Sequence, residues 1–145
     1  MANRHKSRES ALEILYAWSS AEQDALMIPG LLADRIQLPQ RKGQDEAYLR
    51  ELVTGVTEQC EALDEEIAMA VRGRSLASVA HIEMNVLRIA VWELRNRLEI
   101  PYRVVINEAL QLTRTYADES ARGFINGVLD RLARTLRQQE VPAGR

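Results

Sequence analysis

The chain has 145 residues, of which 46% are hydrophobic, and its formal net charge is −2. This length suits one domain that buries a core without metal ions or disulfide bonds, so we expect a single domain over residues 1–145. The only cysteine, Cys60, excludes an intramolecular disulfide and a thiolate zinc cluster. No stretch has the pattern of a signal peptide or a membrane span, and we therefore expect a cytoplasmic protein.

The first half of the chain is predicted to be helical because apolar residues recur every three or four positions. The basic amino end, residues 1–7, has no apolar anchor and is expected to be flexible. A helix is predicted over residues 10–20 and a weaker one over residues 24–35. The longest helix is predicted over residues 45–71, with acidic side chains opposite its apolar face and Gly73 as a left-handed cap beyond its end.

The second half is predicted to contain three further helices. A helix over residues 79–94 is apolar almost all round, which is typical of a helix covered on several sides. Pro101 is expected at the first position of the next helix. Asp118 or Ser120 is expected to cap the last helix, whose apolar stripe runs to Leu136, and residues 138–145 are expected to be a flexible tail. The sequence thus predicts an all-α fold, a compact bundle of six or seven helices.

The sequence offers no pattern that supports catalysis. His81-Ile82-Glu83 resembles half of a zinc deaminase site, but the cysteine pair that completes such a site is missing. Arg41-Lys42-Gly43 lacks the flanking glycine and the following hydroxyl of a phosphate-binding loop. We therefore predict that the protein is not an enzyme and uses no cofactor and no metal.

Basic residues gather at the amino end, although the whole chain is slightly acidic. Arg4, Lys6 and Arg8, with His5 between them, precede the first acid, Glu9. Such cations can follow the phosphates of single-stranded RNA, and flat side chains can stack on its bases. Later helices carry arginines that could extend this patch and aromatic residues that could stack, namely Arg88, Arg114 and Arg122, and Tyr16, Tyr116 and Phe124.

The small number of cations indicates that RNA binding would need a helper. Three or four phosphate contacts give a salt slope of about −2 to −3, which is weak for a single module. We expect a protein partner to supply a second surface, and Glu83 is a candidate contact for it, a buried and satisfied carboxylate being the alternative. Two other possibilities stay open: a helical protein-binding adaptor whose basic end serves only solubility, and a homodimer.

Five segments resemble the NusB family, in the family's order and spacing, between about residue 4 and residue 136. They are residues 8–18 (RESALEILYAW), 48–56 (YLRELVTGV), 82–94 (IEMNVLRIAVWEL), 100–109 (IPYRVVINEA) and 124–130 (FINGVLD). The resemblance implies a NusB-like fold and a transcription antitermination factor. Such a factor binds boxA RNA together with the ribosomal protein NusE and joins the RNA polymerase antitermination complex, chiefly in ribosomal RNA synthesis.

The resemblance also assigns residues to two surfaces. The RNA surface would include Arg4, Lys6, Arg8 and Phe124, to which the residue pattern adds His5 and Arg122. The NusE surface would include Tyr16, Glu83 and Arg88. We expect the basic amino end and the helix end that carries Phe124 to form one continuous face.

The chain departs from the family pattern at two places. His5 and Ser7 interrupt the arginine run, and Gly123 stands where a longer polar side chain is common. Asn107, Glu108 and Asn126 resemble functional residues, but we interpret them as internal hydrogen-bonding or capping groups.

Overall fold

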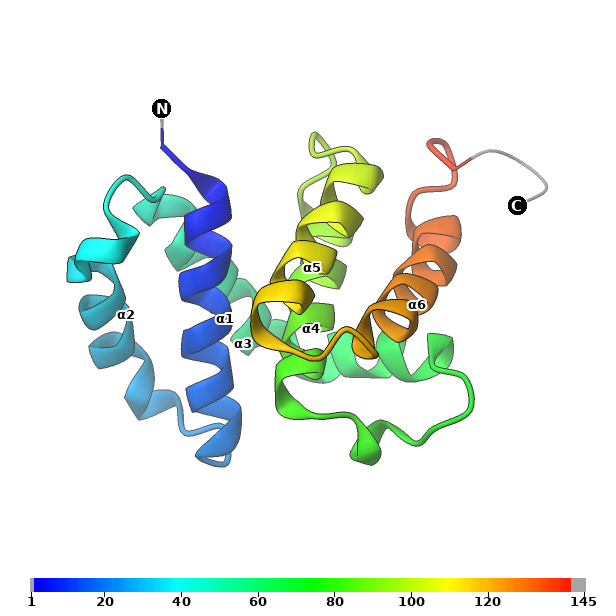
Figure 1. Cartoon of the computed structure of the whole chain (residues 1–145), viewed down its shortest axis with the longest axis horizontal. Coiled ribbons are helices and arrows are strands. Elements are labelled where there is room, and N and C mark those ends of the chain that lie inside the picture. The colour runs from blue at the N-terminus through cyan, green and yellow to red at the C-terminus, as the bar shows by residue number, and fades with distance from the viewer. Residues whose placement is uncertain (1, 142–145) are drawn as a thin grey trace. The chain divides into compact units, whose positions relative to one another are not determined.

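The computed structural model describes residues 2–141 (Figure 1). The helices are α1 (Arg4–Ser20), α2 (Ile28–Gln37), α3 (Glu46–Ala70), α4 (His81–Asn96), α5 (Tyr102–Tyr116) and α6 (Ala121–Leu136). The connections between the first four helices contain the 3-10 turns η1 (Ala25–Met27), η2 (Pro39–Arg41) and η3 (Leu76–Ser78). Among the described residues, the only strand-like pairing is an isolated bridge between Asn3 and Gln44. The predicted all-α class and its six helices are confirmed.

The chain divides into two compact units, Met1–Gln59 and Cys60–Arg145. α3 begins in the first unit and ends in the second, so a helix, and no linker, crosses the boundary. The expectation of a single domain stays a prediction. Between residues 2 and 141 no helix is both long and apolar enough to cross a membrane.

The first unit is built on the apolar faces of its helices. α1 contacts α2, beside which it runs in Figure 1. Leu12 and Leu15 of α1 and Leu49 and Leu52 of α3 have no exposed surface. Outside this core, Glu13 of α1 binds two arginines from the following segments, with Arg35 Nε at 3.0 Å and Arg41 Nη2 at 2.5 Å. Burial of the apolar faces is the main favourable contribution to the stability of such a unit.

The second unit is organised around α4, which contacts both α5 and α6, while these two also contact each other. Every residue from 84 to 94 is buried. This burial explains why the segment is apolar almost all round and confirms that α4 is covered on several sides. Leu112 of α5 and Val128 of α6 are also fully buried.

The start of α1 differs from the prediction. The helix begins at Arg4, six residues before the predicted start at residue 10. Arg4–Ser7 therefore form the first turn of a helix, and the flexibility of the amino end stays a prediction. The polar composition of this turn concealed it, because the periodicity of apolar residues starts only at Ala11.

Two predicted helix ends also differ. Pro101 was predicted at the first position of α5, but it is the N-cap, the residue just before the helix begins. Ser120 is the N-cap of α6, but its side chain makes no capping hydrogen bond.

Gly73 has the predicted left-handed backbone, with φ +77°, and lies three residues after α3. The last carbonyl of α3, on Ala70, accepts a hydrogen bond from Arg131 Nε at 2.7 Å.

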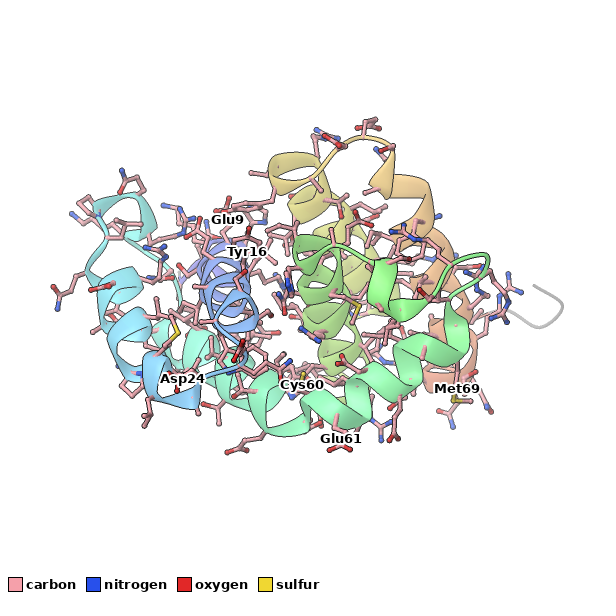
Figure 2. All side chains as sticks on the ribbon, turned by 90° about the horizontal axis from the view of Figure 1, so that it is seen from below. Glu9, Tyr16, Asp24, Cys60, Glu61 and Met69 are labelled. Atoms are coloured by element: carbon pink, nitrogen blue, oxygen red, sulfur yellow. The ribbon has the colours of Figure 1, made fainter. Side chains whose placement is uncertain are left out.

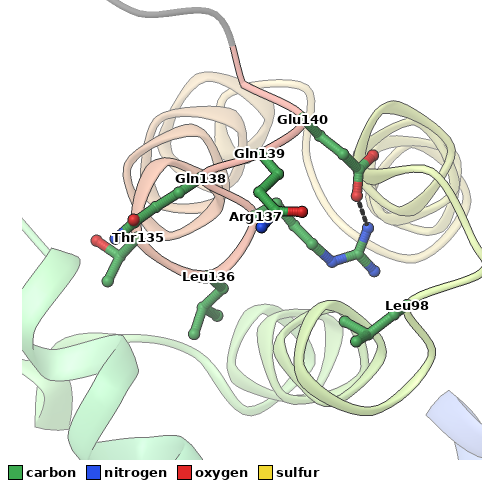
Figure 3. Close-up of a pocket in the computed structure, with 7 residues that line it drawn as sticks. All are labelled: Leu98, Thr135, Leu136, Arg137, Gln138, Gln139 and Glu140. Carbon is green, nitrogen blue, oxygen red and sulfur yellow. Dashed lines mark hydrogen bonds and ion pairs between the residues drawn. The ribbon is translucent and has the colours of Figure 1, made fainter.

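Arg137 binds the far end of α4 and the turn that follows it. Its guanidinium donates hydrogen bonds to four backbone carbonyls and also contacts the Glu140 carboxylate, beside a surface hollow (Figure 3). The four carbonyls belong to Glu93, Leu94, Arg97 and Ile100. Residues 138–140, predicted as the beginning of a flexible tail, form turns on this surface, whereas residues 142–145 lie outside the described part of the chain.

Candidate nucleic-acid interface

The basic start of α1 is held against the turn that precedes α3. Asn3 Oδ1 accepts a hydrogen bond from the Lys6 backbone N–H at 3.1 Å and so caps the helix. The Asn3 backbone N–H donates to the Gly43 carbonyl at 2.8 Å. Gly43 has φ +89°, a conformation that glycine adopts at little cost. Ser7 Oγ donates to the Asp45 carbonyl at 2.8 Å. The predicted cations are thereby placed on a regular helix.

Two of these cations face the same aromatic ring. The guanidinium carbon of Arg4 lies 4.3 Å from the centroid of the Tyr48 ring, and that of Arg8 lies 5.6 Å from it. Both distances are within the range of cation–π attraction. Arg8 is only 4% exposed, whereas the Arg4 side chain is 39% exposed and lies 3.7 Å from the Asp45 carboxylate. Arg4 is therefore open to a phosphate, whereas Arg8 is buried beside Tyr48, and its predicted contact with RNA stays a prediction.

Lys6 links the start of α1 to a further cation, Lys42. Its Nζ donates to the Lys42 carbonyl at 2.8 Å, so that the exposed Lys42 lies beside the start of α1. We call Arg4, Lys6 and Lys42 the amino-end patch. Sequence alone carries no sign that Lys42 belongs to it, because the two lysines are 36 positions apart. His5 is half-buried and its Nε2 lies 3.9 Å from the Glu9 carboxylate.

Tyr16 is a large aromatic residue at the surface of α1. Its side chain is 44% exposed and lies on the same side of the helix as Glu9, seven residues earlier (Figure 2). Tyrosine is enriched at protein–protein interfaces, where its ring is buried and its hydroxyl finds a polar partner. This exposure is compatible with the predicted role of Tyr16 in partner binding.

A second cluster lies in the second unit and connects two of the predicted site residues. The Arg74 guanidinium carbon is 4.5 Å from the centroid of the Phe124 ring. Arg74 Nη1 lies 3.5 Å from Glu83 Oε1, and Arg74 Nη2 donates to the Ser78 carbonyl at 3.1 Å. Phe124 and Glu83 were predicted as contacts for RNA and for a partner, respectively. Arg74 was not predicted, because its position depends on the path of the loop between α3 and α4.

Arg88, predicted to contact the partner, is used inside the second unit. It is 6% exposed, and its Nε and Nη2 each donate to the Asp64 carboxylate at 2.8 Å. Its Nη1 donates to Asn85 Oδ1 at 3.0 Å. Burial by itself would lower the pKa of Arg88, but the hydrogen bonds and the charge of Asp64 raise it above the ordinary value. This pair ties α3 to α4, and a contact between Arg88 and a partner stays a prediction.

The remaining predicted polar residues have mixed surroundings. Arg122, in the first turn of α6, is exposed as expected for an RNA contact. Asn107 and Asn126 are exposed as well, so our interpretation of these two as internal groups is wrong. Both lie inside helices, where the backbone already pairs with itself and does not need their side chains. Glu108 is half-buried.

The described residues contain no arrangement that could hold a metal ion through three or more His, Cys, Asp or Glu side chains. His81 is exposed at the first position of α4. Cys60 is buried, with its sulfur 3.8 Å from Asp64 Oδ2. What the two clusters offer chemically is positive charge, an aromatic ring and a carboxylate, which are groups for binding.

Comparison with known proteins gives consistent matches. The NusB family model matches residues 5–134. The transcription antitermination protein NusB of Yersinia pestis (strain Pestoides F) is 37% identical over 139 residues, covering 96% of this chain and 98% of that protein. T. maritima NusB has a similar structure, with a TM-score of 0.79 and 25% identity over 98% of this chain and 96% of that one.

A further solved structure contains a complex. It is a crystal structure of the antitermination factors NusB and NusE with double-stranded RNA. The matched chain has a TM-score of 0.74 and 24% identity, over 91% of this chain and 96% of that one. At this identity the likeness concerns the fold.

Proposed function

Because the chain belongs to the NusB family, we propose that it is a transcription antitermination factor that binds single-stranded boxA RNA together with the ribosomal protein NusE. The pair would join the RNA polymerase antitermination complex, chiefly during ribosomal RNA synthesis. In this proposal the protein is cytoplasmic, works by binding alone and is not an enzyme. The observation that carries the proposal is the 37% identity to a protein of that name over nearly the full length of both chains.

The chemistry of the two clusters supports the RNA part of the proposal. The amino-end patch offers three cations from α1 and the turn before α3, and Phe124 offers a half-buried ring with Arg122 exposed in the same helical turn. Cations that follow phosphates and rings that stack on bases are the usual means of gripping a flexible RNA strand. Together they suit an RNA with unpaired bases better than a duplex, whose bases are already stacked.

The partner part rests on Tyr16 and Glu83. Tyr16 is exposed, and Glu83 Oε1 is buried without a hydrogen-bond partner among the described residues. A buried acceptor without a donor is costly, so a partner cation or N–H that reached Glu83 would gain a strong bond. The NusB–NusE–RNA structure makes NusE the partner to test.

We further propose that the two units act as one domain and that each cluster contributes contacts to RNA. Three or four phosphate contacts give only a modest affinity, and NusE would add the surface that makes binding tight.

The proposal can be tested by titrating labelled boxA RNA with the full-length protein, with and without NusE, at about 50 mM and about 200 mM salt. We expect NusE to tighten RNA binding. The substitutions K6Q and K42Q should each weaken binding and reduce the magnitude of the salt slope by about 0.7. The matched control is R50Q, which removes an exposed cation from α3 in the same unit but outside the amino-end patch.

The result also decides between RNA binding and the adaptor alternative. An adaptor would bind NusE while RNA contributed nothing at either salt concentration. Equal salt slopes for wild type, K6Q and R50Q would contradict the assignment of the amino-end patch as the RNA surface.

A further inference from the structure

Arg74 lies where three segments of the second unit meet. It belongs to the loop between α3 and α4, and its guanidinium contacts Glu83 in the first turn of α4 and Phe124 in the first turn of α6. Its Nη2 is held by the Ser78 carbonyl, and Ser78 Oγ in turn donates to the Ser75 carbonyl at 2.7 Å. The loop itself therefore holds the guanidinium between the carboxylate and the ring.

The contact between Arg74 and Glu83 is a weak one. The 3.5 Å between Nη1 and Oε1 exceeds the roughly 2.7–2.9 Å of a strong charge-assisted hydrogen bond. Glu83 Oε1 is buried and accepts no hydrogen bond from any described residue. The Glu83 side chain as a whole is 16% exposed, so a donor from another molecule could approach the carboxylate and bind it more strongly than Arg74 does, without having to break a good bond.

The contact between Arg74 and Phe124 places this cation at the ring. At 4.5 Å from the centroid, the guanidinium covers part of a half-buried ring. While Arg74 also faces Glu83, the two charges largely cancel there. Once Glu83 is neutralised by another cation, Arg74 becomes an unmatched positive charge beside the ring, where an RNA phosphate would lie if a base stacked on Phe124.

We propose that Arg74 couples the two binding events: a partner that occupies Glu83 releases Arg74 to attract RNA at Phe124. Arg74 is thus a positioning residue that acts through its neighbours. The proposal rests on the proposed function, in which Glu83 meets NusE and Phe124 meets RNA. Since coupling between two binding sites is reciprocal, RNA bound at Phe124 should strengthen NusE binding by the same factor.

The link between Glu83 and Phe124 can be tested in the free protein. Phe124 is the only phenylalanine, so incorporation of 4-fluorophenylalanine gives a single fluorine signal from this ring. We expect E83Q to move that signal, because Arg74 then changes its position or its charge balance over the ring. E83Q should have little further effect once R74Q is present. The matched control is E61Q, which removes an exposed carboxylate from α3 of the same unit (Figure 2).

A fluorine signal that does not respond to E83Q would overturn the proposed link. The same holds if E83Q moves the signal equally in the wild type and in R74Q. Circular dichroism of each variant verifies that it is folded, and R74K serves as a second variant if R74Q is not.

The coupling itself is measured from RNA affinity with and without saturating NusE. We expect R74Q to reduce the enhancement by NusE about two- to fivefold, the range of an exposed cation–π contact. R74K keeps the charge but lacks the planar guanidinium, so an intermediate loss is expected. The control is R72Q, at an exposed arginine of the same loop whose guanidinium donates to the backbone carbonyls of Met69 and Val71.

The outcomes separate the two proposals. If RNA and NusE bind the wild type and R74Q leaves the NusE enhancement unchanged, the role of Arg74 is overturned and the proposed function stands. If the wild type binds neither RNA nor NusE, the proposed function is overturned and the coupling with it.

Discussion

At the scale of single residues, the Arg137 guanidinium binds four backbone carbonyls and the Glu140 carboxylate. It is 4% exposed and lies one position beyond α6, where its guanidinium meets carbonyls at the end of α4 and in the turn before α5. The last carbonyls of a helix have no partner within that helix, and a buried arginine with several N–H groups can serve several of them. A side chain from one helix thereby completes the end of another.

The substitution R137M should lower the free energy of unfolding by about 3 kcal/mol, because the buried carbonyls of Leu94 and Ile100 lose the donors that Arg137 supplies. Methionine keeps much of the length of the side chain and so limits the cavity. Urea unfolding would measure the change. R134Q is the control, since the pair that Arg134 forms with Asp130 is exposed and its loss should cost less than about 0.5 kcal/mol. Equal midpoints for the two variants would contradict this role of Arg137.

The partner of Arg137, Glu140, should make stability depend on pH. Burial opposes the charged form of Glu140, but hydrogen bonds from the Tyr102 backbone N–H and from Arg137 outweigh it and hold the pKa below its ordinary value of 4.5. A carboxylate whose pKa is lower in the folded state stabilises the fold above its unfolded pKa. This contribution is lost as the pH falls through the folded pKa.

We therefore expect E140Q to be less stable than the wild type near neutral pH, with a difference that shrinks as the pH falls below 4.5. Unfolding by urea at a series of pH values measures this difference. E119Q, at an exposed carboxylate before α6, is the control and should show no such convergence. A difference that stays constant down to the acid limit would rule out the assigned role of Glu140.

The contacts that sequence could not predict have one property in common. Arg74, Arg88 and Arg137 each bind groups that are distant in the chain, at Phe124, Asp64 and Leu94 respectively. A polar side chain carries no periodic signal that names its partner, so these contacts appear only in the folded structure. Glu83 and Phe124, in contrast, could be named from the sequence because they lie in segments that resemble the family.

At the scale of the elements, periodicity predicted the helices well and their ends less well. α4 was predicted as a covered helix from its apolar composition, and its buried run from residue 84 to residue 94 confirms this. The start of α1 was missed because side-chain capping and a neighbouring turn determine it. Asn3 and the turn at Gly43 supply the hydrogen bonds that an apolar pattern would not reveal.

The cap of α1 leads to a prediction at this scale. N3A should lower the free energy of unfolding by about 1 kcal/mol, because Lys6 N–H loses its acceptor. It should also weaken RNA binding if the first turn, which carries Arg4 and Lys6, must be helical to bind. The control is N107A, since Asn107 is exposed within α5 and alanine favours a helix. N3A and N107A of equal stability, measured by urea unfolding, would refute the capping role.

At the scale of the whole molecule, the proposal of a single domain predicts a single unfolding transition. Each unit contains one of the two tryptophans, Trp18 in the first and Trp92 in the second, and both are 4% exposed. In W92F the fluorescence reports the first unit, and in W18F it reports the second. We expect the fluorescence transition to coincide with that of circular dichroism in both variants.

A fluorescence transition that precedes the loss of helix in either variant would show that the two units unfold separately. W92F should be the milder change, since the Trp92 N–H is buried without a hydrogen-bond partner among the described residues, and phenylalanine removes that group. If the two units unfold separately, the single-domain proposal is replaced by one of two domains that share α3.

The continuity of α3 has a consequence for anyone who wishes to express the halves of this protein as separate fragments. A cut between Gln59 and Cys60 falls within a helix of 25 residues. Each fragment would therefore have a new helix end at the cut, whose backbone N–H or carbonyl groups have no capping partner. Gene fusions and split reporters are better placed in the segment around Gly73, where the helix has already ended.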